Sequence, residues 1–272
     1  RRESPSAASW APWHGASRNV ADSPELPLVR RRAHQYPLTM SPVSPPGSGQ
    51  ILSHVAVYSL RSSYWGLEEE ERDRVANAWR NAVGAAAEAV HFYRTFGSRE
   101  GSDVLVWTSM AAEAPDAPAR FFENYGDLLR PFRRYFRLQH VLWGLTAVSP
   151  YSRGASARGI DPFAARSMRY LVVYPFAKTH DWYQMPADER RAMMSDHIRV
   201  GREYPSTDQL LLYSTGLQDH EFVVLYETDD LTAFSGLVRE LRATEVRGYT
   251  LLDTPVHVGV YASPDATGLP WP

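Results

Sequence analysis

The sequence predicts an α+β fold of two tandem ferredoxin-like halves, an arrangement known as a dimeric α+β barrel. Two observations predict it. The chain has 272 residues, 44% of them hydrophobic and 12% aromatic, which is enough for one large or two small cores. Beyond residue 50, the order of strand and helix patterns, β-α-β-β-α-β, occurs twice. Such halves form antiparallel sheets with helices on one face, so the two sheets can stack or close against each other with the helices outside.

The first half, residues 49–148, shows each element in turn. Residues 51–60 show an alternating pattern that includes β-branched and aromatic side chains, which is typical of a strand. Residues 67–92 predict a long helix whose first turn is rich in carboxylates, which suits the positive end of the helix dipole. The remaining elements are a weak strand (92–96), a short apolar strand (104–108), a helix that opens with proline (118–129) and a strand (138–148).

The second half, residues 168–264, repeats this order after a Gly/Ser/Arg-rich linker at 149–167. Its predicted elements are a strand (169–176), a helix (186–203), two strands (209–214 and 222–227) around a turn at Gly216, a helix (231–243) and a final strand (249–261).

Residues 1–48 differ from the rest in composition. They hold eight of the twenty prolines and show neither helical nor strand periodicity, so they predict a disordered arm. The chain begins at Arg1, and Met40 precedes a Pro/Ser/Gly stretch. One hypothesis is therefore that the native start is Met40 and that the arm before it is not native.

Composition excludes several classes of protein. The 29 cationic and 31 acidic side chains give a net charge of −2, which argues against a broad nucleic-acid surface. The absence of cysteine excludes disulfides, thiolate zinc sites, iron–sulfur clusters and cysteine nucleophiles, so a metal must bind His, carboxylate or Tyr or arrive within a cofactor. No apolar run approaches the roughly 18 to 20 residues of a membrane span, and no signal-peptide pattern is present. We expect a soluble, cytoplasmic protein.

The predicted helix at 186–203 carries the first candidate site residue. Its apolar face contains Met193, Met194, His197, Val200 and Gly201, so the imidazole points where the methionines point. From this pattern alone, a hydrogen-bonded core histidine is the favoured interpretation. The alternative is an axial ligand to a haem iron, because a buried neutral imidazole in an apolar wall is typical of such ligands.

Two other segments carry candidate chemistry. Tyr174 and Lys178 lie four residues apart at the end of a predicted strand. They are either a reactive pair or simply polar residues that solvate the edge of the sheet. Lys178 is also the only lysine among the 29 cationic residues. Residues 130–137 mix arginines with aromatic residues, as do protein segments that stack on RNA bases. Because the net charge of the chain is near zero, the favoured interpretation is a helix end that covers the sheet.

Three segments of the second half resemble the chlorite dismutase family, a group of haem proteins built as paired ferredoxin-like halves. They are YPFAKTHDWYQMPADERRAMMSDHIRVGREY (174–204), STGLQDHEFVVLYETDDLTAF (214–234) and YTLLDTPVHVGVY (249–261). The first half agrees more loosely, so the resemblance covers about residues 50–262. Chlorite-degrading members have an arginine where this chain has Gln209, and glutamine there, with the YPxxK string, is similar to the Gram-positive-type coproheme decarboxylase branch.

The resemblance implies roles for individual residues. His197 matches the proximal iron ligand, Tyr174 the redox-active tyrosine and Lys178 a lysine that assists at the reacting propionate. The other matching positions, which the resemblance places around the porphyrin or the imidazole, are Gln209, Trp182, Tyr151 and Glu245. Met194 is expected at the porphyrin because it shares the apolar helix face of His197. Glu245 is expected to bond the proximal imidazole. Arg158 and Arg166 compete for the position of an arginine that binds a propionate.

The implied reaction is the oxidative decarboxylation of iron coproporphyrin III (coproheme) to haem b, the last step of haem biosynthesis, with hydrogen peroxide as the oxidant. The resemblance also implies a homopentamer and transient contact with the coproporphyrin ferrochelatase. Two alternatives remain open: a chlorite dismutase or weak haem peroxidase, and a haem-binding protein without catalysis.

Overall fold

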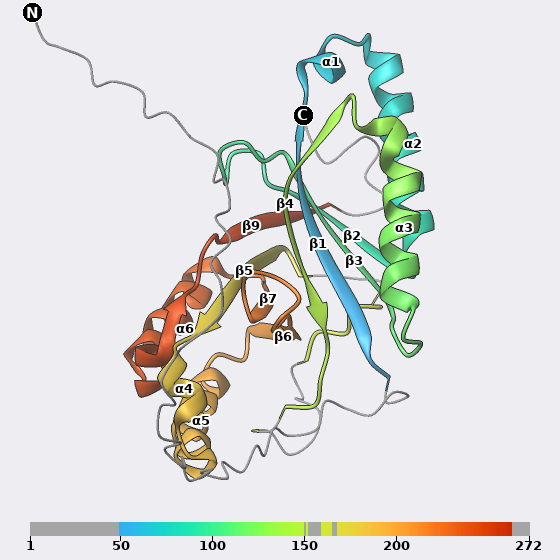
Figure 1. Cartoon of the computed structure of the whole chain (residues 1–272). Coiled ribbons are helices and arrows are strands. Elements are labelled where there is room, and N and C mark those ends of the chain that lie inside the picture. The colour runs from blue at the N-terminus through green and yellow to red at the C-terminus, as the bar shows by residue number, and fades with distance from the viewer. Residues whose placement is uncertain (1–48, 150, 152–158, 165–167, 263–272) are drawn as a thin grey trace, which may run out of the picture. The chain divides into compact units, whose positions relative to one another are not determined.

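The computed structural model describes residues 49–149, 151, 159–164 and 168–262, all of which belong to one compact unit (Figure 1). The predicted arm at 1–48, the proposed start at Met40, and both Arg158 and Arg166 lie outside the described residues.

The first half forms an antiparallel sheet with the strand order β4-β1-β3-β2, the order of a ferredoxin-like fold. Its elements are β1 (Ile51–Leu60), α1 (Ser62–Trp65), α2 (Glu69–Ala86), β2 (Ala89–Arg94), β3 (Val104–Ala111), α3 (Ala117–Leu129), the 3-10 turn η1 (Arg130–Phe132) and β4 (Phe136–Leu145).

The predicted helix at 67–92 is too long. The helix ends at Ala86, and Ala87 already has extended backbone angles. Residues of β2 then pair with β3, beginning with Ala89 opposite Ser109. Strand pairing therefore overrides the high helix propensity of the alanines in this segment.

The second half repeats the topology with the order β6-β7-β5-β9. Its elements are β5 (Tyr170–Lys178), α4 (His180–Gln184), α5 (Ala187–Arg202), β6 (Thr207–Tyr213), β7 (Phe222–Thr228), α6 (Leu231–Ala243), the 3-10 turn η2 (Glu245–Tyr249), β8 (Thr250–Leu252) and β9 (His257–Ala262). The prediction of one final strand at 249–261 is wrong, because a turn, a short strand and Pro255 precede β9. Proline has no N–H to donate to a strand ladder.

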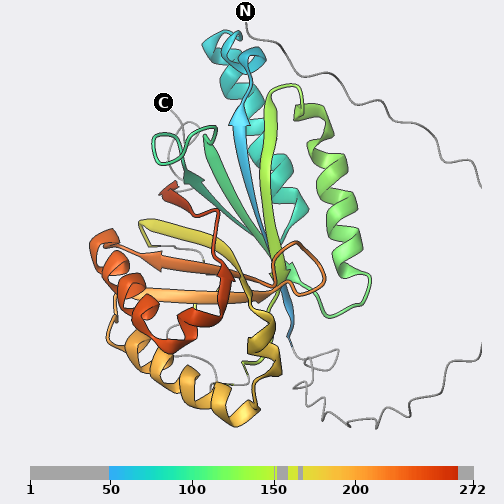
Figure 2. The ribbon, with the colours of Figure 1, turned by 60° about the vertical axis from the view of Figure 1, so that its left-hand side comes forward.

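The two sheets join edge to edge. One seam pairs Leu145 of β4 with Tyr213 of β6, and the other pairs β2 with β9 from Phe92–Ala262 to Arg94–Val260. Because β5 also pairs with β7, eight of the nine strands close into a circuit with β8 at its margin. Figures 1 and 2 show the helices on the outer faces of this circuit. The predicted fold of two ferredoxin-like halves is confirmed.

The helix-covered cores of the two halves differ. In the first half, Trp79 of α2 stacks on Phe136 with ring centres 4.4 Å apart, and α2 buries four residues in all. The corresponding core of the second half is small, and α5 buries only Val200. The interior of the strand circuit forms a third core, which includes Trp107 and Leu225. The second half thus leaves one of its helices thinly packed.

Candidate active site

Strand β5 divides its side chains between two surfaces. Val172 and Tyr174 belong to the small core beside α6, whereas Leu171 and Val173 belong to the interior of the strand circuit. This division follows from the period of two in a strand. We call the first of these the helix-facing surface of the second half.

Lys178 is the last residue of β5. Its backbone N–H donates to Oε2 of Glu221 at 2.7 Å, and its Nζ lies 3.3 Å from Oγ1 of Thr250 and 4.6 Å from the ring centre of Trp182. Burial and then the positive charge of Arg247 lower the pKa of Lys178 to about 8. This ammonium therefore releases a proton near neutral pH far more readily than an ordinary lysine does.

His197 is half-buried on α5, and its Nδ1 lies 3.4 Å from Oγ1 of Thr244. The Thr244 hydroxyl donates its own proton to the carbonyl oxygen of Leu241 at 2.7 Å, so it can only accept from the imidazole. This bond assigns the imidazole proton to Nδ1 and leaves the lone pair on Nε2. Burial and then the charge of Lys178 lower the pKa of His197 to about 4. A neutral imidazole of this tautomer can bind a metal through Nε2.

Tyr174 lies near the middle of β5 on the helix-facing surface. The ring of Tyr226 lies beside it, with the two ring centres 6.0 Å apart. Burial raises the pKa of Tyr174, so the phenol is neutral. The charged groups that act on it are Asp253 and the two arginines paired with that carboxylate, Arg242 and Arg247, both at 2.8 Å.

Trp182 is placed by α4, a short helix that the sequence did not predict. Its side chain is buried, and its ring centre lies 5.8 Å from that of Tyr249 and 6.5 Å from that of Tyr151. Burial raises the pKa of Tyr151. Together with the contacts above, these distances place Lys178, Trp182 and Tyr151 in one group, and His197 is linked to it by the charge of Lys178.

The other predicted site residues are spread around this group. Gln209 is exposed on β6 directly opposite Tyr226, so its side chain shares the helix-facing surface. Met194 is half-buried, three residues before His197 on α5. Glu245 is exposed at the start of η2. Among the described residues, the partner of the imidazole Nδ1 is Thr244 instead, and a bond from Glu245 stays a prediction.

Sequence reasoning missed three residues that the structure brings to the site. Thr244 bonds the imidazole, and the ring of Tyr226 lies beside that of Tyr174. Glu221 accepts from the Lys178 backbone and from the Tyr183 hydroxyl. Alternation along residues 222–228 was the available signal for Tyr226, since it separates the two faces of that strand. The partners of Thr244 and Glu221 depend on how α6 and the turn before β7 meet β5 in space.

The second half fits an iron porphyrin. A helix that covers a sheet usually buries a full apolar stripe, but on α5 Met194 and Ile198 stay half-exposed. On the sheet, Phe176 and Leu211 are also only partly buried. A flat apolar ligand that covers such surface gains about 25 cal/mol per Å². The neutral imidazole of His197 supplies a donor for iron, and the neighbouring cations suit carboxylates on the ligand.

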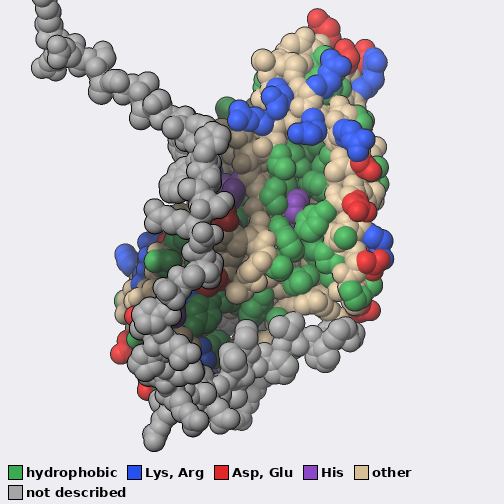
Figure 3. All heavy atoms as spheres, viewed as in Figure 1, with side chains coloured by type: hydrophobic (Ala, Val, Ile, Leu, Met, Phe, Trp, Pro, Cys, Tyr) green, Lys and Arg blue, Asp and Glu red, His purple; other side chains and the backbone are tan. Residues whose placement is uncertain are grey.

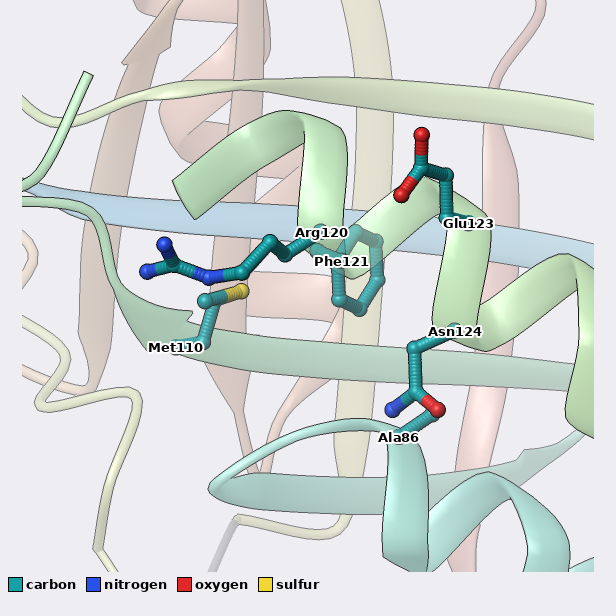
Figure 4. A pocket seen from close by; sticks show the side chains of 6 residues that line it. All are labelled: Ala86, Met110, Arg120, Phe121, Glu123 and Asn124. Carbon is teal, nitrogen blue, oxygen red and sulfur yellow. The ribbon is translucent and has the colours of Figure 1, made fainter. Parts of the chain in front are cut away.

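Two other features lie outside this site. Tyr135 and Phe136, in the arginine-rich segment, are buried in the first half, so they present no stacking surface to bases. Arg133 and Arg137 are exposed in this segment. Figure 3 shows cationic side chains gathered at the end of the first half where α1 lies in Figure 1. A shallow cavity of about 410 Å³ lies on the first half, between α2, β3 and α3 (Figure 4), and none of the predicted site residues lines it.

The fold and the site define a paired ferredoxin-like protein whose second half carries a neutral, half-buried histidine on a thinly packed helix. The chain belongs to the chlorite dismutase family, because the profile of the family described as Chlorite dismutase matches residues 68–262. None of the described helices has the length and apolar character that crossing a bilayer requires.

Curated relatives include two coproheme decarboxylases. That of Mycolicibacterium smegmatis is 28% identical over 169 residues, which cover 61% of this chain and 70% of the relative. That of Staphylococcus saprophyticus is 30% identical over 168 residues, which cover 57% and 65%. Among solved structures, the chlorite dismutase of Candidatus Nitrospira defluvii in complex with imidazole has a TM-score of 0.66 at 20% identity and covers 78% of this chain and 91% of that one. This last likeness concerns the fold.

Proposed function

We propose that the protein is a coproheme decarboxylase, which converts iron coproporphyrin III to haem b with hydrogen peroxide as the oxidant. The observation that carries the proposal is the grouping of a neutral histidine, a lysine of lowered pKa and a partly buried, neutral tyrosine on one half of the fold. The names of the two coproheme decarboxylase relatives support the same reaction.

Binding of the substrate is assigned to residues of the second half. His197 holds the iron through Nε2, while Trp182, Met194 and the helix-facing surface contact the macrocycle. Iron coproporphyrin III carries carboxylates, and Lys178 and Arg247 provide positive charge for them. The iron of the bound porphyrin supplies the centre at which peroxide is reduced.

For each of two propionates, the reaction consumes one peroxide and one proton and gives a vinyl group, carbon dioxide and two waters. Tyr174 is assigned the transfer of the first oxidising equivalent: its phenol loses a proton and an electron and then takes a hydrogen atom from the β-carbon of the propionate. The second electron leaves the substrate radical as carbon dioxide is released, and it completes the reduction of the peroxide. Lys178 pairs with the carboxylate and, with a pKa of about 8, exchanges a proton at Nζ.

Gln209 argues against chlorite chemistry as the main activity. An uncharged amide supplies no fixed positive charge for an oxyanion, which an arginine at this place does. The homopentamer, the cytoplasmic location and the contact with the ferrochelatase stay predictions of the resemblance.

The decisive experiment is mass spectrometry of the porphyrin after porphyrin-free protein is mixed with iron coproporphyrin III and peroxide. The proposal expects loss of two carboxyl groups as carbon dioxide. Tyr174→Phe is expected to bind the substrate and yield no haem b. Sustained oxygen release from chlorite without decarboxylation indicates a chlorite dismutase, and binding without any conversion indicates a haem-binding protein.

A further inference from the structure

A β-bulge sets the direction of the Lys178 side chain. On the paired strands β5 and β8, Ala177 is opposite Leu252 and Lys178 is opposite Thr250, so the register shifts between the two β5 residues. Bulges bend a strand and re-aim side chains, and they are frequent beside active sites. The backbone N–H of Lys178 is held as well, at 2.7 Å from Oε2 of Glu221. The lysine side chain therefore leaves the end of β5 from a fixed backbone.

Uncharged groups hold the Lys178 ammonium. Its Nζ donates to Oγ1 of Thr250 at 3.3 Å and to the carbonyl oxygen of Val246 at 3.5 Å. The ring centre of Trp182 lies 4.6 Å from Nζ, within the range of a cation–π contact. An ammonium has three N–H donors and no acceptor, so the lysine is the donor in both hydrogen bonds and one N–H remains.

The remaining N–H has no charged partner among the described residues. None of their carboxylates forms an ion pair with Nζ. The carboxylate of Glu221 accepts from the Lys178 backbone instead. The carboxylate of Asp253 is paired with two arginines. Because a half-buried ammonium without a counter-charge is costly, an anion that reaches the third N–H is strongly favoured.

We propose that Thr250 is a positioning residue for Lys178: its hydroxyl oxygen, with the Val246 carbonyl, takes two of the three ammonium donors and leaves the third for a propionate of the bound porphyrin. The inference rests on the proposed function, in which Lys178 pairs with the reacting carboxylate and exchanges a proton. Thr250 suits this role because its β-branched side chain is stiff and lies directly opposite Lys178 in the strand pairing. Thr250 acts through Lys178 and itself exchanges no proton.

Thr250→Val tests this role, because it keeps the shape of the side chain and replaces the hydroxyl by a methyl group. Thr250→Ser restores the hydroxyl. The matched control is Thr146→Val. It removes a half-buried hydroxyl from the first half, where this group accepts from the backbone N–H of Ile51 at 2.9 Å.

The first measurement needs no porphyrin. Lys178 is the only lysine, so protein isotope-labelled at lysine Nζ and Cε gives a single lysine side-chain signal by NMR. Loss of an acceptor disfavours the charged ammonium, so we expect Thr250→Val to shift this signal and to lower its titration midpoint by about half a pH unit. Thr250→Ser is expected to restore both, and Thr146→Val to change neither. A signal that Thr250→Val leaves in place overturns the contact and, with it, the proposal.

The second measurement is turnover of iron coproporphyrin III with hydrogen peroxide. Thr250→Val is expected to lower kcat about tenfold, Thr250→Ser to recover most of this loss, and Thr146→Val to keep the kcat of the wild type. Full kcat in Thr250→Val refutes the positioning role. If the wild type forms no haem b, the proposed function fails instead, and the NMR result still decides whether Thr250 holds the Lys178 ammonium.

Discussion

Replacing Lys178, the only lysine of the chain, by methionine is expected to stabilise the fold while it abolishes decarboxylation. The pKa of Lys178 is about 8 in the folded protein against an ordinary value of 10.5. At pH 7 the ammonium is charged in both the folded and the unfolded chain, and only the folded chain bears the cost of its burial. Between about pH 8 and 10.5 the unfolded chain binds more protons, so the stability of the wild type rises with pH in this window.

The expected gain in the free energy of unfolding is the sum of opposing contributions. The pKa difference of about 2.5 corresponds to about 3.4 kcal/mol. Lys178 is only partly buried, so solvent screening reduces this to about half. The contact of its ammonium with the Trp182 ring offsets about a further 0.5 to 1 kcal/mol. The net gain from Lys178→Met is about 1 kcal/mol at pH 7, or about 2 to 4 °C in Tm for a chain of this size.

Urea unfolding of the porphyrin-free protein at neutral and alkaline pH measures this gain. Lys178→Arg is the matched control, because a guanidinium stays charged throughout the range and keeps its destabilising effect. The reasoning is refuted if Lys178→Met is no more stable than the wild type at pH 7. It is equally refuted if the advantage of Lys178→Met does not shrink above about pH 10.

Further predictions concern the histidines and the first half. His197→Ala is expected to lose the five-coordinate, histidine-ligated absorption spectrum of haem-loaded protein, and an unchanged spectrum means that another residue is the ligand. Burial lowers the pKa of His54, His197 and His257 to about 4. Urea unfolding should therefore show that stability falls as the pH drops from 6.5 to 4, by about 2 to 3 kcal/mol for His54 alone. A stability that does not change over this pH range contradicts the prediction. Trp79→Ala should cost about 3 to 5 kcal/mol in the same assay because it empties the stack on Phe136, and a loss below about 1 kcal/mol contradicts that packing.

Local patterns predicted the order of the elements, because alternation and helical period are properties of short segments. These patterns failed to predict structure where contacts between distant segments of the chain determine it. Residues 89–94 leave their helical pattern to pair with β3, and Pro255 interrupts what reads as a single strand. Closure of the strand circuit depends on pairs such as Leu145 with Tyr213, which no local pattern contains.

In the candidate site, too, local patterns predicted some residues and contacts between distant segments determine the others. Helical spacing placed His197 on the apolar face of its helix, and the four-residue spacing placed Tyr174 and Lys178 on one strand. The choice between Thr244 and Glu245 beside the imidazole depends on where α6 ends, since neighbouring residues there point in different directions. The pairing of Tyr174 with Tyr226 required the register of two strands.

The thin packing of α5 gives a ligand that covers this helix a large share in the stability of the second half. A molecule that binds only the folded state adds stability by mass action, about 2.7 kcal/mol when its concentration is a hundred times its Kd. A half whose helix buries only Val200 opens at lower cost than one anchored by Trp79. Proteases act on opened segments, so we expect limited proteolysis to cut porphyrin-free protein in the second half before it cuts porphyrin-loaded protein.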